Sequence, residues 1–192
     1  MSKVIYLTGA PAAGKSSTTR LMAERMPGLL VWEYGARLTS YIMAKAADVT
    51  GQDDLRALSA SVVTPEDVAE VDQALLAFVE KHRATKNVLI DSHPVTKEVY
   101  GFRITPFSFR QFEALRPDEI WVLYANPEEA LRRIAADAGG RPMVTAEEAR
   151  SHTLLQASIA ATYSASLRCP AYMFDTATPR DELVDRLIDR LS

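Results

Sequence analysis

Residues 9–16 read Gly-Ala-Pro-Ala-Ala-Gly-Lys-Ser and match the phosphate-binding pattern G-x-x-x-x-G-K-[ST]. An apolar segment, residues 3–8, precedes this run, and a helix-forming segment follows it, which is the strand–loop–helix context that the pattern requires. The two glycines let the backbone curl so that successive N–H groups point inward and form a nest for anions at a helix start. This run therefore predicts a nucleoside triphosphate site in an α/β fold.

Two side chains of the run have direct chemical roles in such a site. Lys15 can reach the terminal phosphates, and the Ser16 hydroxyl can bind Mg²⁺. An ordinary glycine turn before a helix is the alternative interpretation, which the flanking strand and helix disfavour. The residues expected to bind ATP are Gly9, Ala10, Pro11, Ala12, Ala13, Gly14, Lys15, Ser16, Ser17 and, outside this run, Arg133.

The charge balance gives no reason to expect a polyanionic partner. The formal net charge is −3, so the chain lacks the broad basic field that attracts nucleic acid or a membrane surface. The single cysteine excludes an internal disulfide and fits a reducing compartment. No segment approaches the ~20 apolar residues of a membrane-spanning helix, and the N-terminus lacks a signal-peptide layout. We therefore expect a cytoplasmic protein that binds neither nucleic acid nor membranes.

Apolar runs alternate with helical patterns along the chain, which indicates a parallel sheet with crossover helices. We expect one domain, residues 1–192, with ample length to bury a core. Capping signals such as Thr64-Pro65-Glu66-Asp67 mark several helix starts. The expected strands are residues 4–7, 29–32, 88–90, 120–124 and 171–174, and the expected helices are residues 15–26, 36–48, 65–84, 127–137, 146–167 and 180–191.

Two segments exceed what a minimal α/β chain needs. Residues 34–86 form a long connection between the second and third strands, which predicts a helical insertion that binds a second molecule beside the triphosphate. Residues 137–145 include Gly139-Gly140-Arg141-Pro142, which suits a short mobile lid over phosphates. A plain helix–helix turn is the alternative interpretation of that second segment.

Charged side chains near the strand ends are the candidates for catalysis. Asp91 ends an apolar strand on the ligand side of a parallel sheet, where it would help Ser16 to hold Mg²⁺; a solvated carboxylate is the alternative. Arg133 and Arg141 would neutralise charge that develops on the transferred group. Arg132 is held in reserve, and a surface salt bridge between Arg133 and Asp137 remains an alternative.

The second substrate is expected to contact cations on the other side of the site. A phosphate-bearing acceptor favours one or two arginines that bind it bidentately. His93, close after Asp91, is a candidate for a phosphate contact or an acid–base role, although a structural histidine explains it equally well. The candidate acceptor-binding residues, each of which could instead lie on the surface, are Arg37, Arg56, His93, Lys97 and Arg103.

Together these residues resemble the nucleoside-monophosphate kinases, in particular adenylate kinases of the archaeal type. Two positions depart from that family: Ala12 stands where many members have glycine, and Gly139-Gly140-Arg141-Pro142 replaces an Arg-x-Arg-Asp run. The similar motifs, which span nearly the whole chain, are residues 4–17, Tyr34-Gly35, Ala44-Lys45-Ala46, Asp54-Leu55-Arg56-Ala57-Leu58, Asp91-Ser92-His93 with Lys97 and Gly101-Phe102, Arg116-Pro117-Asp118, and Arg132-Arg133-Ile134 with Arg141.

The resemblance implies a three-layer P-loop kinase fold in which helices flank five parallel strands in the order 2-3-1-4-5. It also implies Mg-ATP as phosphoryl donor, a nucleoside monophosphate as acceptor and Arg56 as a contact of that acceptor. Archaeal-type adenylate kinases tend to form trimers, so a homo-oligomer is a further expectation.

Three hypotheses follow for the activity. The first is transfer of the γ-phosphoryl group of ATP to a nucleoside monophosphate, with AMP as the leading acceptor. The second is a P-loop kinase of the same architecture with another small-molecule acceptor, which the arginine-poor lid suggests. The third is a nucleotide-dependent switch ATPase whose output is a protein contact.

Overall fold

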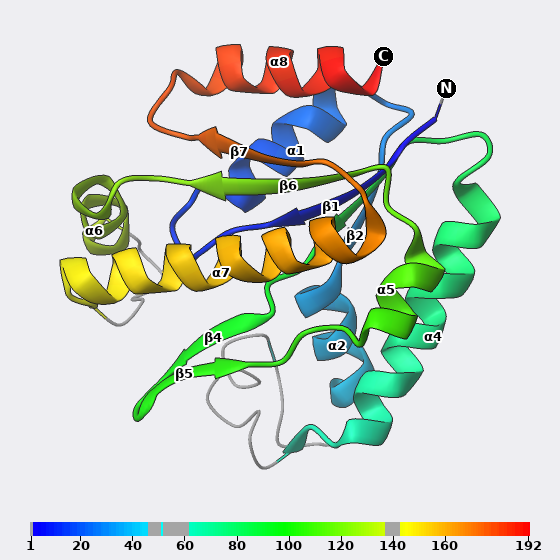
Figure 1. Ribbon diagram of the computed structural model, residues 1–192, viewed down its shortest axis with the longest axis horizontal. Coiled ribbons are helices and arrows are strands. Elements are labelled where there is room, and N and C mark those ends of the chain that lie inside the picture. The colour runs from blue at the N-terminus through cyan, green and yellow to red at the C-terminus, as the bar shows by residue number, and fades with distance from the viewer. Residues whose placement is uncertain (1, 46–50, 52–61, 137–142) are drawn as a thin grey trace.

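The computed structural model describes residues 2–45, 51, 62–136 and 143–192. Two expected site residues, Arg56 in the insertion and Arg141 in the lid, therefore lie outside the described residues. The described part of the chain forms a parallel sheet between two layers of helices, with a separate two-stranded hairpin beside it (Figure 1).

The central sheet has the strand order β2-β3-β1-β6-β7, and every neighbouring pair is parallel. Numbered by themselves along the chain, these strands have the order 2-3-1-4-5, so the expected P-loop kinase fold is confirmed. β1 lies in the middle with both faces buried, which explains its unbroken apolar sequence. The five strands are β1 (Val4–Thr8), β2 (Leu30–Glu33), β3 (Val88–Asp91), β6 (Glu119–Tyr124) and β7 (Ala171–Asp175).

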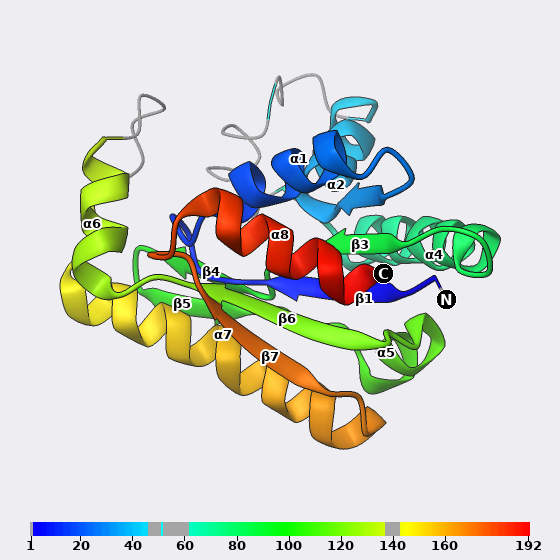
Figure 2. The same cartoon turned by 90° about the horizontal axis from the view of Figure 1, so that it is seen from above.

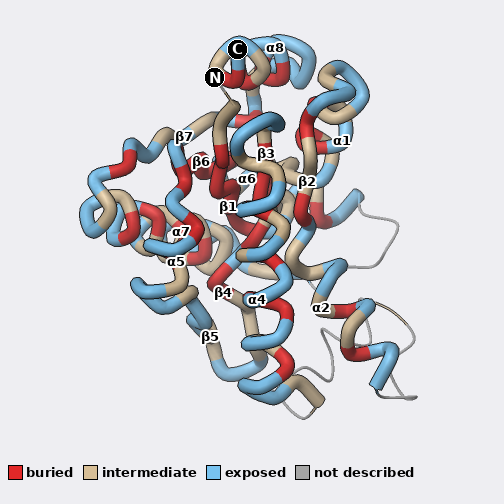
Figure 3. Tube along the Cα trace, turned by 90° about the vertical axis from the view of Figure 1, so that its right-hand side faces the viewer, coloured by how far each residue is buried: buried red, intermediate tan, exposed pale blue. Residues whose placement is uncertain are grey.

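The helices divide between the two faces of the sheet, and alternate β1 residues belong to two separate cores (Figure 2). Ile5 and Leu7 pack in the core beneath α1 and α8, whereas Val4 and Tyr6 pack against α4, α5 and α7. The buried residues are concentrated along the strands (Figure 3). The helices are α1 (Lys15–Arg25), α2 (Tyr34–Met43), α4 (Pro65–His82), α5 (Phe109–Leu115), α6 (Pro127–Ala135), α7 (Ala146–Leu167) and α8 (Arg180–Leu191).

Side-chain caps fix several helix starts as the sequence predicts. Thr64 accepts a hydrogen bond from the N–H of Asp67 at the start of α4, and Thr145 and Glu148 form the same reciprocal capping box before α7. Asn126 caps α6 in a similar way. α2 begins at Tyr34, two residues earlier than expected, because it follows directly on β2.

Three elements between β3 and β6 were not predicted. β4 (Val95–Glu98) and β5 (Gly101–Ile104) form an antiparallel hairpin, and α5 follows it. The hairpin strands are short and rich in charge, so they lack the apolar alternation that marks a strand in a sequence. Within the described ranges, every helix is too short or too polar to cross a membrane.

Candidate active site

The loop from Gly9 to Ser16 connects the end of β1 to the first turn of α1. Gly9 and Gly14 have φ angles of 155° and 78°, a region that residues with a Cβ atom disfavour. A Cβ atom at Gly9 would lie only 2.3 Å from the backbone oxygen of Leu123 in β6. Gly14 caps α1 without a side-chain hydrogen bond, so the N–H groups of the first turn remain available to an anion.

Lys15 and Asp91 meet at the carboxyl end of the sheet. β1 and β3 are neighbours with Leu7 in register with Asp91, so the strand ends bring the loop and the carboxylate together. Lys15 Nζ lies 3.9 Å from Asp91 Oδ1 and donates a hydrogen bond of 3.2 Å to the Gly9 carbonyl. Only 13% and 12% of the two side chains is exposed. The structure therefore brings these two expected catalytic residues into one partly enclosed site.

The carboxylate of Asp91 fits the expected magnesium site. Asp91 Oδ1 has no hydrogen-bond partner within the described part of the chain. Burial raises the pKa of Asp91, and the nearby charge of Lys15 opposes this effect. A divalent cation would satisfy the oxygen, and Mg²⁺ prefers hard oxygen ligands such as carboxylates and hydroxyls. Ser16, which follows Lys15 in the loop, can supply the hydroxyl.

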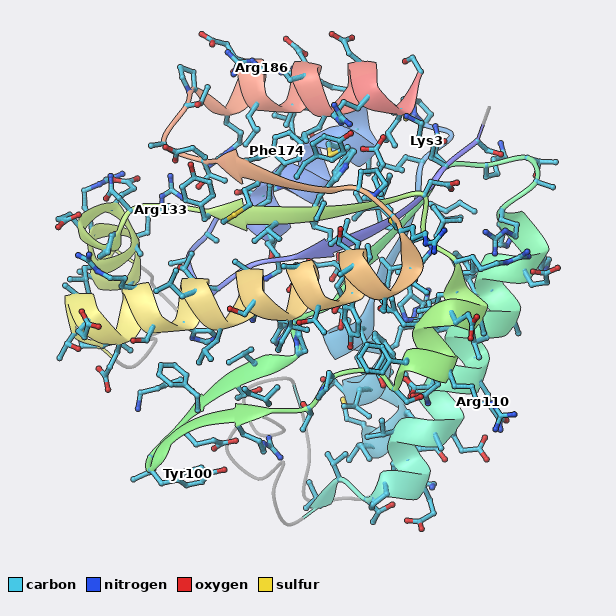
Figure 4. All side chains as sticks on the ribbon, viewed as in Figure 1. Lys3, Tyr100, Arg110, Arg133, Phe174 and Arg186 are labelled. Atoms are coloured by element: carbon cyan, nitrogen blue, oxygen red, sulfur yellow. The ribbon has the colours of Figure 1, made fainter. Side chains whose placement is uncertain are left out.

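Arg133 lies beside the phosphate loop, at the end of the sheet where α6 begins (Figure 4). Its Nη1 donates to the Ala12 carbonyl at 3.2 Å and to Thr176 Oγ1 at 2.8 Å. Its Nη2 donates to the Thr176 carbonyl at 2.8 Å, and its Nε donates to Glu129 at 2.7 Å. Arg133 therefore joins α6, the phosphate loop and the segment after β7. It also places a positive charge beside the loop.

Arg132, its neighbour, has a different environment. Its side chain is 70% exposed and bonds to Glu129, so α6 directs only Arg133 at the loop, as the helical spacing predicts. Both arginines lower the pKa of Glu129 from its ordinary value of 4.5 to about 2. The expected alternative pairing of Arg133 with Asp137 falls partly outside the described residues, and Glu129 is the partner that the structure shows.

A small hollow opens next to Gly14, between Arg133, Thr176 and Arg180. Arg180, the first residue of α8, is among the residues that line this hollow. Thr176 follows the last strand and has no motif that could identify it from the sequence.

Those of the expected acceptor-binding residues that the structure describes are spread over several elements. Lys97 and Arg103 alternate across the hairpin, because Lys97 pairs with Phe102 whereas Arg103 pairs with Thr96. Lys97 Nζ lies 3.3 Å from Glu148, and Arg103 Nη2 lies 3.0 Å from Glu98. Glu148 is distant from Lys97 in the sequence, so this pairing cannot be read from the sequence. The hairpin therefore presents the two cations on opposite faces.

The other two described candidates lie apart from this pair. Arg37 is an exposed residue of α2, and its guanidinium lies 4.9 Å from the centre of the Trp32 ring. His93 is exposed in the segment between β3 and β4, directly after the strand end that carries Asp91. His93, unlike Arg37, is therefore close in sequence to a residue of the phosphate site.

A family model described as an AAA domain matches residues 8–150. Two curated relatives are adenylate kinases from archaea. The Pyrococcus abyssi enzyme is 25% identical over 165 residues, which cover 85% of this chain and 81% of the relative. The Thermococcus sibiricus enzyme is 28% identical over 166 residues, with the same coverage of 85% and 81%.

Solved structures share the fold at lower sequence identity. The tunicamycin resistance protein of Deinococcus radiodurans aligns with a TM-score of 0.57 and 15% identity, covering 100% of this chain and 96% of that one. A shikimate kinase from Acinetobacter baumannii aligns with a TM-score of 0.53 and 14% identity, covering 99% and 93%. A sugar kinase from a Janibacter species gives 0.54 and 14%, covering 98% and 94%.

Proposed function

We propose that this chain, which belongs to the AAA domain family and is a P-loop kinase, transfers the γ-phosphoryl group of ATP to a nucleoside monophosphate. AMP is the leading acceptor, because the archaeal relatives that align with most of the chain are named adenylate kinases. The observation that carries the proposal is the arrangement of Lys15 and Asp91 around the Gly9–Ser16 loop. That arrangement supplies a donor site for a triphosphate.

The residues of this site supply positioning and positive charge, which are the main requirements of phosphoryl transfer. N–H groups of the loop and Lys15 would hold the β- and γ-phosphates of ATP. Arg133 would add positive charge beside Ala12, and Arg141 in the expected lid would add more. Because Lys15 and Asp91 are largely buried, water is partly excluded where these charges act.

Ser16 and Asp91 are the residues that would hold Mg²⁺ beside the phosphates. When bound, the ion would supply positive charge that neutralises the phosphates. The buried Asp91 Oδ1, which has no hydrogen-bond partner within the described residues, supports this assignment. The positive charge nearest to this oxygen that the structure shows is Lys15 Nζ, at 3.9 Å.

On the acceptor side, we propose that His93 and Lys97 lie nearest to the incoming monophosphate. The segment from Asp91 leads directly to both residues, and Lys97 is held by Glu148 at the start of α7. Arg37, Arg56 and Arg103 remain proposed contacts of the acceptor, although Arg103 lies on the face of the hairpin opposite to Lys97.

A different small-molecule acceptor is the second candidate function. The observation that favours it is that Lys97 and Arg103 are paired with Glu148 and Glu98, so fewer cations than expected are open to a phosphate. The lid sequence Gly139-Gly140-Arg141-Pro142 is also poor in arginine. An uncharged hydroxyl acceptor would require fewer cations than a nucleoside monophosphate.

The direct test incubates the purified protein with Mg-ATP and each of AMP, GMP, CMP, UMP and dTMP, and quantifies diphosphates by chromatography. We expect ADP to form with AMP at twice the amount of AMP consumed. Shikimate and a panel of sugars form the second arm of the assay. Transfer in that arm only would replace the first candidate function with the second.

Lys15→Met is the matched control for this assay. We expect it to abolish transfer because the variant removes the charge that holds the terminal phosphates, while circular dichroism and the unfolding midpoint stay close to those of the wild type. Substantial phosphotransfer by the variant would remove Lys15 from the mechanism.

A further inference from the structure

Three polar residues of α7 form a stripe that faces the β4–β5 hairpin. Glu148, His152 and Gln156 are four residues apart, so they lie on one side of the helix. Glu148 pairs with Lys97 at 3.3 Å, and the His152 ring meets the Phe102 ring edge-on at 5.2 Å. The stripe becomes more buried along the helix, because Gln156 is fully buried and His152 is 5% exposed.

A buried hydrogen-bond chain runs from this stripe to both sides of the candidate site. The Val95 carbonyl of β4 accepts from Gln156 Nε2 at 3.3 Å and bonds to His152 Nε2 at 3.0 Å. Gln156 Oε1 accepts from the Thr8 hydroxyl at 2.9 Å. The amide orientation is determined by these partners, because a flipped amide would place two oxygens together.

The position of the Val95 carbonyl follows from the pairing of the hairpin. Pro94 O accepts a hydrogen bond of 2.7 Å from Thr105 N across the hairpin. Because carbonyls alternate along an antiparallel strand, the next carbonyl, that of Val95, points to the outer edge. A lone two-stranded hairpin is marginally stable in water. His152 and Gln156 therefore satisfy an edge that the hairpin leaves open.

His152 donates to the Val95 carbonyl through Nε2. Burial lowers the pKa of His152, and the charges of Lys15 and Lys97 lower it further, whereas the bond to Val95 opposes these effects. A carbonyl can only accept, so Nε2 carries the proton.

The two ends of the chain are the two substrate sides of the proposed kinase. Thr8 directly precedes Gly9 of the phosphate loop, and Val95 directly follows the segment that carries Asp91 and His93. The same segment is bound to β1 by Ser92 N, which donates to the Leu7 carbonyl at 3.0 Å. A displacement of Val95 would therefore move the acceptor-side residues relative to the donor loop.

We propose that Gln156 and His152 are positioning residues that couple the phosphate loop to the acceptor-side hairpin through Thr8 and Val95. The proposal rests on the proposed function for its kinetic consequence. Neither Gln156 nor His152 belongs to the phosphate loop, whose residues would contact ATP. Their effect should therefore fall on the transfer step and not on ATP binding.

The test compares three variants with the wild type. Gln156→Met keeps the length of the side chain but removes both of its hydrogen bonds, and His152→Phe keeps the ring contact with Phe102 but removes the Nε2 donor. Tyr163→Phe is the matched control, because it removes a different buried hydrogen bond of α7, the 2.9 Å bond from the Tyr163 hydroxyl to the Phe107 carbonyl. Unfolding midpoints are measured for all of them.

We expect kcat to fall roughly 10- to 100-fold in Gln156→Met, because a small misplacement of a reacting group has effects of this size. KM for ATP should stay within about twofold, since the phosphate loop is unchanged. His152→Phe should lower kcat in the same direction, and Tyr163→Phe should retain the wild-type kcat. A wild-type kcat in both Gln156→Met and His152→Phe, with only a lower unfolding midpoint, would overturn the proposal.

Amide hydrogen exchange with a non-hydrolysable Mg-ATP analogue gives a readout that requires no acceptor. We expect the analogue to protect residues 95–98 in the wild type but not in Gln156→Met, whereas residues 9–16 are protected in both proteins. Unchanged exchange at residues 95–98 of the wild type would overturn the coupling. If the wild type phosphorylates no nucleoside monophosphate, the proposed function fails, and this comparison still decides the coupling.

Discussion

Ala12 has a φ angle of 62°, in the left-handed region that costs a residue with a Cβ atom about 1–2 kcal/mol. Many nucleoside-monophosphate kinases have glycine at this position. We expect Ala12→Gly to raise the free energy of unfolding by about 1 kcal/mol, because the relief of strain exceeds the added entropy of the unfolded chain. Urea denaturation measures the difference.

Ala13→Gly provides the matched control at the neighbouring residue. Ala13 is buried and its φ angle is negative, so the same change there removes packing without relieving strain and should lower stability. A loss of stability in Ala12→Gly as well would show that the left-handed alanine is not strained in this loop.

At the same scale, the donor-side and acceptor-side residues differ in how far local signals in the sequence determine their positions. Lys15 and Asp91 could be predicted because a loop motif and a strand end fix their positions locally. Lys97 could not, because its partner Glu148 is distant in sequence and is brought near by a hairpin that was not predicted.

At the scale of the element, Arg133 fastens α6 to the phosphate loop. Lysine at this position cannot reach Ala12, Thr176 and Glu129 together, because it lacks the planar fork of donors. We expect Arg133→Lys to lower the free energy of unfolding by about 2 kcal/mol and to weaken ATP binding, as followed by urea denaturation and calorimetric titration. Arg132→Lys, which changes an exposed side chain of the same helix, should alter neither quantity.

The pH dependence of stability should also reflect α6. Arg132 and Arg133 lower the pKa of Glu129 from 4.5 to about 2, so the folded protein binds this proton less readily than the unfolded chain. Their stabilising effect is therefore complete above about pH 4.5 and is lost as the pH falls toward about 2. We expect Glu129→Gln to lose less stability across that window than the wild type in denaturation series. A constant difference between the two proteins at every pH would contradict this account.

The sequence predicted the five strands of the sheet and most helices from local signals, but it missed β4, β5 and α5. Capping boxes at Thr64 and Thr145 located α4 and α7, and apolar runs located the five strands of the sheet. The box at Ser108 and Gln111 was equally readable before α5, but β4 and β5 derive their stability from α7, which no local pattern reveals.

At the scale of the whole molecule, the two ends of the strands differ in role: we call them the carboxyl edge and the amino edge of the sheet. The carboxyl edge carries the phosphate loop and Asp91, whereas the amino edge is tied together by ion pairs. Figure 4 shows Arg133 and Lys3 at these opposite ends. At the amino edge Glu119 accepts hydrogen bonds from Lys3 at 3.1 Å, Arg190 at 3.0 Å and the Trp121 indole at 2.8 Å.

Substitutions of Glu119 should affect stability without affecting catalysis. Glu119→Ala should lower the free energy of unfolding by about 2–3 kcal/mol, because it leaves the buried Trp121 N–H without an acceptor and breaks two ion pairs. Glu119→Gln keeps an oxygen for Trp121 and should lose less. Because this network lies at the edge away from the phosphate loop, kcat of both variants should equal that of the wild type well below the unfolding temperature. A lower kcat with an unchanged unfolding midpoint would show that the amino edge also influences the site.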